Sequence, residues 1–186
     1  IGTIVDLIQY RIANEHTVTK VSSNKMETKY GEFDVHSYKD SISGSLHLAF
    51  TMGVIDPNDP LLVRVHIPNT VRDICDVYNS NRTSWSFSNA LEKIAEQGKG
   101  VAVLLSGEDY GQDLDQNIAN VLSDGSETAS INRSGSDLTI GTGSQILRDL
   151  GVGKMRLLSY PAKLNAISGF DLEVVEFVQF NANDSS

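Results

Sequence analysis

The chain has 186 residues, of which 40% are hydrophobic and 21% are charged, and its net charge is −9. This length suffices for one well-buried domain with a short appendage. The acidic balance disfavours a non-specific nucleic-acid partner, because binding to phosphates requires a basic surface. The single cysteine, Cys75, excludes an internal disulfide and any zinc site built from several cysteines.

Neither a membrane span nor a secretory signal is evident in the sequence. No apolar run approaches the roughly 18 residues that a span requires, and no basic-then-apolar leader is present. Together with the lack of a disulfide framework, this predicts a cytoplasmic protein with no membrane partner. The chain begins at Ile1, within a patterned segment, so we expect it to belong to a longer polypeptide.

The first third of the chain predicts a short helix followed by an antiparallel hairpin. Apolar residues recur at helical spacing over residues 4–12. Alternating apolar residues on either side of turn chemistry predict a β-hairpin over residues 28–54. After a loop with two prolines, residues 61–66 predict a third strand, whereas residues 67–84 show no clear period.

The rest of the chain alternates between helical and strand patterns. Ser86 or Ser88 is expected to cap a helix that ends at Gly98. The apolar run 100–105 is typical of a strand buried on both faces, parallel to the strand at 61–66. The later expected elements are a short helix at 116–122, a helix capped by Thr142 or Ser144 and ended by Gly151, a strand at 155–158, a short helix at 164–168 and a strand at 172–180. The predicted fold class is α/β, with a mixed, mostly parallel sheet, flanking helices and an N-terminal antiparallel hairpin.

Two loops invite alternative interpretations. The acidic loop at 107–115 is either a solvated loop or an oxygen-ligand site for magnesium or calcium. Small polar residues at 123–144 predict a flexible loop. Its last four residues, Gly141 to Ser144, would then stand at a helix N-terminus, either as a glycine-rich turn with a cap or as a phosphate cradle.

Several single residues also have a functional and a structural interpretation. Arg64 and His66 either face an anion or pair with a neighbouring acid. Trp85 and Phe87 are interpreted as core or interface residues rather than as a base-stacking pair, and Cys75 as an inert thiol. The remaining histidines lie on separate segments without ligand spacing.

Three segments resemble GTP cyclohydrolase II: Leu-Val-Arg-Val-His at 62–66, the helix-to-strand stretch 90–101, and 144–152 with Gln-Ile-Leu-Arg-Asp-Leu-Gly. Upstream, residues 5–11 and 30–33 are similar to the linker and first hairpin of two-domain riboflavin-pathway proteins. In those proteins the domain follows a 3,4-dihydroxy-2-butanone-4-phosphate synthase domain.

The resemblance implies a domain organisation and partners. It implies that residues 1–22 form a linker helix from an N-terminal synthase domain of the same polypeptide, and that residues 23–180 form the cyclohydrolase-like domain. Residues 181–186 are expected to be a disordered tail. The family resemblance also implies a homodimer.

The family's chemistry depends on a zinc ion held by three cysteines, which activates the water that attacks the guanine ring. Aligned without gaps from Arg64 to Leu91, those cysteines fall on Thr70, Asn81 and Thr83, none of which supplies a thiolate. The family's glutamate beside the first cysteine becomes Asn69. We therefore expect no metal and no cofactor.

Other functional positions of the family are changed as well. The arginine of its phosphate loop falls on Tyr110, its catalytic tyrosine on Val121, its nucleophilic arginine near Leu138, and the partner aspartate near Ser136. Of the ligand-contacting positions, three keep the family's residues and are our nucleotide or anion candidates: Arg64, Ser159 and Lys163. No catalytic residue is predicted.

Two functional hypotheses follow. In the first, this is a cyclohydrolase-like domain of a riboflavin-biosynthesis protein that has lost zinc-dependent GTP hydrolysis. It would act as a dimerising scaffold or regulatory module for the synthase domain. In the second, it is a residual or altered cyclohydrolase-type hydrolase that acts on a nucleotide.

Overall fold

A computed structural model describes residues 3, 4, 7, 15–75, 85–106, 118, 133–161 and 170–181, with the backbone alone over 133–139. Its strands form one seven-stranded sheet in the order β1-β2-β3-β5-β4-β6-β7. The strands are β1 (Val18–Thr28), β2 (Gly31–Asp40), β3 (Leu46–Met52), β4 (Leu61–His66), β5 (Gly100–Leu104), β6 (Lys154–Leu158) and β7 (Glu173–Val178). The helices are α2 (Thr70–Asp73), α3 (Phe87–Gln97) and α5 (Arg133–Asp149).

The sheet is mixed, as predicted. The β2–β3 hairpin is antiparallel and β4 pairs in parallel with β5, so both of these predictions are confirmed. Antiparallel pairings also join β1 to β2 and β3 to β5, and parallel pairings join β4 to β6 and β6 to β7. Parallel and antiparallel pairings are therefore equally represented among the described strands, rather than mostly parallel.

Strand β1 was missed in the sequence analysis. It is 11 residues long and nearly all of its side chains are exposed, so its sequence carries no alternation of apolar and polar residues. Backbone pairing with β2, not burial, defines this edge strand. The domain boundary expected at residue 23 falls inside it.

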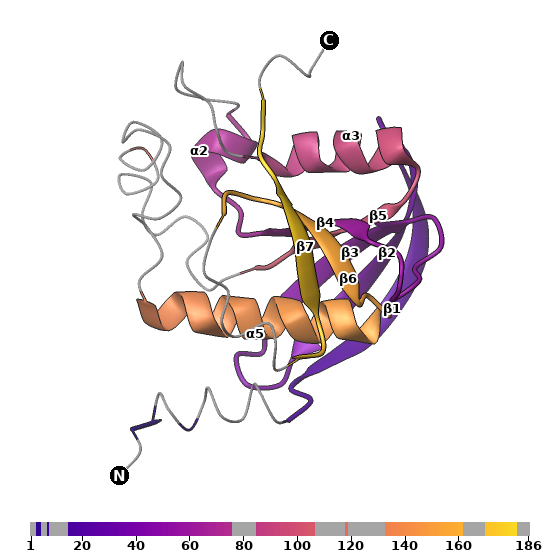
Figure 1. The fold of residues 1–186 in the computed structure, drawn as a ribbon. Helices are drawn as coiled ribbons and strands as arrows, with labels where there is room; N and C mark the ends of the chain where they lie inside the picture. The colour runs from indigo at the N-terminus through magenta and orange to yellow at the C-terminus, as the bar shows by residue number, and fades with distance from the viewer. Residues whose placement is uncertain are drawn as a thin grey trace.

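Helices α3 and α5 cover opposite faces of the sheet (Figure 1). Alternate residues of the central strands point to opposite faces, since side chains in a strand have a period of two. Val63 and Val103 therefore belong to the apolar cluster under α5, whereas Leu62 and Ala102 belong to the cluster under α3. Burial on both faces explains why β4 and β5 read as continuous apolar runs.

Helix α3 follows the local signals in its sequence. The Ser86 side chain accepts a hydrogen bond from the Asn89 amide, which makes Ser86 the N-cap, and Gly98 ends the helix with a left-handed φ of 73°. Leu91 and Ile94 bury its apolar stripe against the sheet. Both predicted ends are confirmed, with Ser86 rather than Ser88 as the cap.

Helix α5 corrects the part of the predicted loop that covers residues 133–144, whereas residues 123–132 of that loop lie outside the described residues. The helix begins at Arg133 and runs for 17 residues. Gly141 to Ser144 therefore lie inside the helix and are buried, so they are neither a cap nor a phosphate cradle. Helix propensity gave the wrong prediction here, because packing against the sheet, rather than local preference, determines which residues occupy this part of the helix. An added Cβ at Gly143 would lie 2.9 Å from Val65 Cγ1, so only glycine lets the helix approach β4 this closely.

The C-terminal end of α5 agrees with the sequence. Gly151 has a left-handed φ of 86°, its N–H bonds to the Arg148 carbonyl at 3.0 Å, and the Val152 N–H bonds to the Leu147 carbonyl at 3.0 Å. These two bonds form a Schellman motif, with Leu147 and Val152 as its buried apolar pair.

Helix α5 also holds the segment that leads into β1. The side chain of Gln145 accepts hydrogen bonds from the backbone N–H of Thr17 at 2.9 Å and of Val18 at 3.2 Å. Its amide nitrogen donates to Thr17 Oγ1 at 3.0 Å, and the Thr17 carbonyl accepts from the Ser41 N–H at 2.8 Å. Thr17 and Gln145 are both buried, so this junction is a fixed point of the fold.

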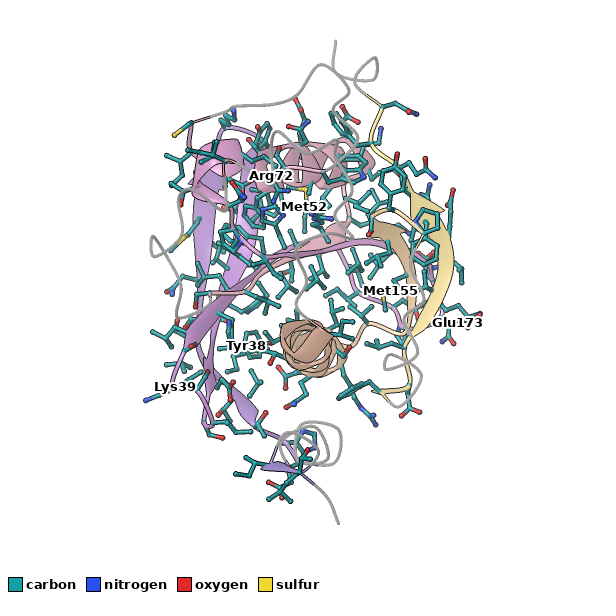
Figure 2. The ribbon with its side chains drawn as sticks, turned by 90° about the vertical axis from the view of Figure 1, so that its left-hand side faces the viewer. Tyr38, Lys39, Met52, Arg72, Met155 and Glu173 are labelled. Carbon is teal, nitrogen blue, oxygen red and sulfur yellow. The ribbon has the colours of Figure 1, made fainter. Side chains whose placement is uncertain are left out.

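Tyr38 forms a second contact with α5, on the same face of the sheet (Figure 2). Its hydroxyl donates to Asp149 Oδ2 at 2.7 Å, and Lys20 pairs with the same carboxylate oxygen at 3.2 Å. Burial, followed by the hydrogen bond to Asp149 and the charge of Asp149, raises the pKa of Tyr38 far above its usual range. The end of α5 is thereby tied to both β1 and β2.

The structure also tests, or leaves open, several smaller predictions. Helix α2 lies in the stretch 67–84, for which no element was predicted. The predicted helices at 4–12, 116–122 and 164–168 and the acidic loop at 107–115 fall outside the described residues, apart from isolated positions. Within the described part of the chain, no helix has the length and apolarity to cross a membrane.

Candidate functional site

The candidate site lies where the parallel strands end. In α/β sheets, ligands bind beyond the carboxyl ends of the strands, where the connecting loops meet. At this edge, β4 ends at His66, Ser106 follows β5, and Ser159 follows β6. Helix α2 continues from the end of β4 (Figure 1).

Arg64 is buried on the α3 face of β4, and its donors are used inside the protein. One terminal nitrogen donates to the Leu158 carbonyl at 2.8 Å, and the other donates to the Trp85 carbonyl at 3.1 Å. Nε lies 3.3 Å from His66 Nδ1. Arg64 therefore joins β4, the end of β6 and the segment that leads into α3.

His66 pairs with Asp73, the neighbouring acid on α2. His66 Nε2 lies 2.8 Å from Asp73 Oδ2, and the histidine side chain is fully buried. Because a guanidinium only donates, Nδ1 of His66 must accept from Arg64, so the ring proton resides on Nε2. Arg64, His66 and Asp73 thus form a directed chain of hydrogen bonds.

The protonation states follow from burial and from these bonds. Burial lowers the pKa of His66 to about 4, against the opposing effect of the Asp73 hydrogen bond. Burial raises the pKa of Asp73, but the His66 hydrogen bond, the charges of His66 and Arg72 and the Asn69 amide outweigh it. The net pKa of Asp73 lies well below its usual range. At neutral pH, His66 is neutral and Asp73 is ionised.

Asp73 is the centre of a short polar turn. Its Oδ2 also accepts from the Asn69 N–H at 2.7 Å, and its Oδ1 lies 3.5 Å from the Phe87 N–H. The Asn69 side chain in turn caps α2 by accepting from the Arg72 N–H at 3.0 Å. The first turn of α3 is therefore linked to the end of β4 through one carboxylate.

Trp85 and Phe87 are core residues, as predicted. The Phe87 ring lies 5.5 Å from the His66 ring and 5.4 Å from the Phe50 ring, between centroids. Trp85 donates its indole N–H to the Val178 carbonyl at 2.8 Å and packs edge-on against Phe180. Neither ring is displayed for stacking on a base.

Of the remaining residues that the sequence singled out, the structure describes only some. Ser159 is half-buried, and its hydroxyl bonds to the Tyr160 carbonyl at 3.1 Å. It follows Leu158, whose carbonyl accepts from Arg64, so these two candidates lie close together in the fold. The backbone alone places Ser136 and Leu138, in the first half of α5. Asn81, Thr83, Tyr110, Val121 and Lys163 lie outside the described residues.

The donors at this site do not fit a thiolate-bound zinc ion. Thr70, which the resemblance aligns with the family's first cysteine, is the first residue of α2. Cys75 is exposed and is the chain's single cysteine, so three sulfur donors are not available. In residues 15–75, 85–106 and the later described segments, no three histidine, cysteine or acidic side chains group in a way that could hold a metal.

Sequence reasoning missed Asp73 and Arg72 as site residues. The only available signal was an acid seven residues after His66, which indicates a partner only once the chain is known to turn back through α2. It also missed the burial of His47 on β3, where Nδ1 accepts from the Ser106 N–H at 3.1 Å.

Comparison with known proteins identifies the family of this domain. A sequence model of the GTP cyclohydrolase II family matches residues 19–179. A 3,4-dihydroxy-2-butanone 4-phosphate synthase of Pseudomonas aeruginosa is 45% identical over 96% of this chain and 48% of that protein. The riboflavin biosynthesis protein RibBA of Aquifex aeolicus is 39% identical over 95% of this chain and 45% of that protein.

A solved structure is similar over the same extent. RibBX of A. baumannii, a two-domain 3,4-dihydroxy-2-butanone 4-phosphate synthase, superposes with a TM-score of 0.69 and 37% identity. The match covers 96% of this chain and 45% of that one. The chain thus spans about half the length of the relatives that it matches. With the fold, the family match and these identities in agreement, the chain belongs to the GTP cyclohydrolase II family.

Proposed function

We propose that this domain has lost zinc-dependent GTP hydrolysis and acts as a dimerising scaffold or regulatory module. Its partner would be a 3,4-dihydroxy-2-butanone-4-phosphate synthase domain of the same polypeptide, in the cytoplasm. The observation that carries the proposal is the donor set, in which threonine and asparagine stand where the family's chemistry needs three thiolates.

The relatives support the same proposal. Proteins 45% and 40% identical to the chain bear the name of the synthase alone, although the matched region is the cyclohydrolase-like one. They are also about twice as long as the chain.

The buried contacts of the site favour a structural role for Arg64. Its donors go to the Leu158 and Trp85 carbonyls and to His66, so it positions the strand ends. Ser159 and Lys163 remain the anion candidates kept from the family. This division of roles is part of the proposal.

The Thr17–Gln145 junction supports a regulatory role. Any movement of the chain before β1 would be transmitted to α5 through buried hydrogen bonds, because Gln145 holds two successive backbone N–H groups there. Since α5 covers a whole face of the sheet, the segment leading into β1 and the core are mechanically linked.

Zinc content and formate release test the loss of hydrolysis. The purified chain is expected to contain no stoichiometric zinc and to release no formate from GTP when zinc is added. An active GTP cyclohydrolase II, assayed in parallel, provides the positive control. Stoichiometric zinc together with formate release would establish the alternative, a residual cyclohydrolase.

The scaffold or regulatory role requires the longer polypeptide. Synthase turnover is measured in the two-domain protein with and without residues 23–180, and its mass in solution is measured by sedimentation. We expect the deletion to change the turnover and to abolish the dimer. Unchanged turnover in a variant that still sediments as a dimer would contradict the proposal.

A further inference from the structure

Two buried hydrogen-bond donors have no partner in the described part of the chain, and both lie at the carboxyl edge of the parallel strands. They are Arg72 Nε and His47 Nε2. Because His47 Nδ1 accepts from the Ser106 N–H, its Nε2 carries the hydrogen and is a donor. His47 lies at the start of β3, next to Leu48, which pairs with Leu104 at the end of β5.

Arg72 has an ion pair but no hydrogen bond from its guanidinium among the described contacts. Nε lies 3.5 Å from Asp73 Oδ1 without satisfying hydrogen-bond geometry. The oxygens of Asp73 already serve His66 Nε2 and the Asn69 N–H, and Oδ1 also lies near the Phe87 N–H. Asp73 is thus shared among several donors and gives Arg72 only a long contact.

Such a donor demands an acceptor. A buried N–H without a partner is costly, so native proteins rarely leave one unexplained. A guanidinium presents five N–H groups in a planar fork that matches an oxyanion. Arg72 lies on α2, on the side of the sheet away from Tyr38 and α5 (Figure 2).

We propose that Arg72 is the anchor of an anion-binding site that takes the oxyanion group of a small molecule, a phosphate ester or a carboxylate. The two terminal nitrogens of the guanidinium donate to the oxyanion, because Nε is shielded from solvent. The ion pair with Asp73, which His66 and Asn69 hold in place, orients the Arg72 side chain. This inference deepens the proposed function, since it names the ligand class of a site that no longer hydrolyses GTP.

The site does not depend on residues kept from the hydrolase. Arg64 is committed to the Leu158 and Trp85 carbonyls, and Arg72 is not among the candidates kept from the family, which are Arg64, Ser159 and Lys163. The net charge of −9 repels anions, so non-specific binding of anions to this surface is unfavourable. Binding should therefore be local to α2 and saturable.

The test is an NMR titration of the folded chain with ribose 5-phosphate, inorganic phosphate and gluconate in separate arms. We expect saturable shifts of the amides at 69–75 with at least one probe, and the arm that binds more tightly identifies the oxyanion. Arg72→Gln should weaken that binding by about tenfold or more, as the loss of a charge-assisted contact implies. Arg148→Gln, which changes an exposed arginine paired with Asp171, should not.

Each other outcome overturns the inference. It fails if no probe saturates, if the shifts spread over the surface, or if Arg72→Gln and Arg148→Gln weaken binding equally. Should Arg72→Gln not fold, Arg72→Lys keeps the charge without the fork and should still weaken binding several-fold; unchanged affinity contradicts the site. The formate assay reports on hydrolysis independently, so the two proposals can fail separately.

Discussion

Gln145 of α5 and Thr17, the residue before β1, are joined by buried hydrogen bonds across 128 positions of sequence. One glutamine side chain satisfies two successive backbone N–H groups and the threonine hydroxyl. The helix on one face of the sheet and the start of its edge strand are thus held by a single residue.

Gln145→Leu should destabilise the fold by about 2–4 kcal/mol, because it leaves the Thr17 and Val18 N–H groups without their acceptor. Chemical denaturation measures the loss, and hydrogen exchange should show faster exchange at residues 17 and 18. Gln97→Leu, at an exposed position of α3, serves as the matched control and should change stability little. Equal effects of the two substitutions would contradict the role of the junction.

Gly143→Ala should destabilise the protein by about 1–3 kcal/mol, although alanine is the better helix former. The new methyl group would lie 2.9 Å from Val65 Cγ1, a β-branched side chain with little freedom to move. Thermal unfolding measures the effect. Adding Val65→Ala should recover part of the loss in a double-mutant cycle; simple additivity would show that the two residues are not in contact.

These two positions show why the sequence failed for α5. Glycine, serine and threonine at 141–144 are poor helix formers, and they also meet the requirements of a loop or a cap. Small residues are needed here because α5 approaches β4 closely, and local helix propensity carries no information about that approach. The opposite holds for α3, where Ser86 and Gly98 carry the cap signals and both ends were predicted correctly.

The candidate site was predicted to a similar, partial extent. Arg64 and His66 were singled out because two polar residues alternate with apolar ones at the end of an apolar strand. The partners of Arg64 are the Leu158 and Trp85 carbonyls, which belong to segments distant in sequence. The partner of His66 is the Asp73 carboxylate, which the four-residue helix α2 brings back to the strand. Main-chain acceptors leave no trace in side-chain patterns, so the contacts of Arg64 with the two carbonyls could not be predicted. The pairing of His66 with a neighbouring acid was one of the predicted alternatives, and Asp73 is that acid.

Stability should fall on acidification because of His66. Its folded pKa of about 4 lies below its ordinary value of 6.5, so only the unfolded state takes up a proton between these values. The fold therefore loses about 2 kcal/mol between pH 7 and pH 5 from this group. Burial also lowers the pKa values of His36 and His47, which act in the same direction.

His66→Gln isolates the contribution of His66 to the pH dependence. Denaturation of the variant at pH 7 and pH 5 should show a smaller difference than in the parent chain. His16→Gln, at an exposed position, should leave the pH dependence unaltered. If His66→Gln retains the full pH dependence, the neutral buried histidine is not its source.

Arg64→Met should cost about 3 kcal/mol or more, because it removes the donors of the Leu158 and Trp85 carbonyls and of His66 Nδ1. The loss should appear in equilibrium unfolding. Arg148→Met, at a half-exposed position, provides the comparison and should have a small effect. A neutral outcome for Arg64→Met would contradict the structural role of this guanidinium.

Trp85 is the chain's one tryptophan, and its indole N–H bonds to the carbonyl of Val178 while its ring meets Phe180. It therefore joins the segment that leads into α3 to the last strand of the sheet. Its fluorescence provides an optical probe that needs no label and senses separation of the C-terminal strand from the middle of the chain. Emission from this residue should change early if β7 detaches before the rest of the sheet opens.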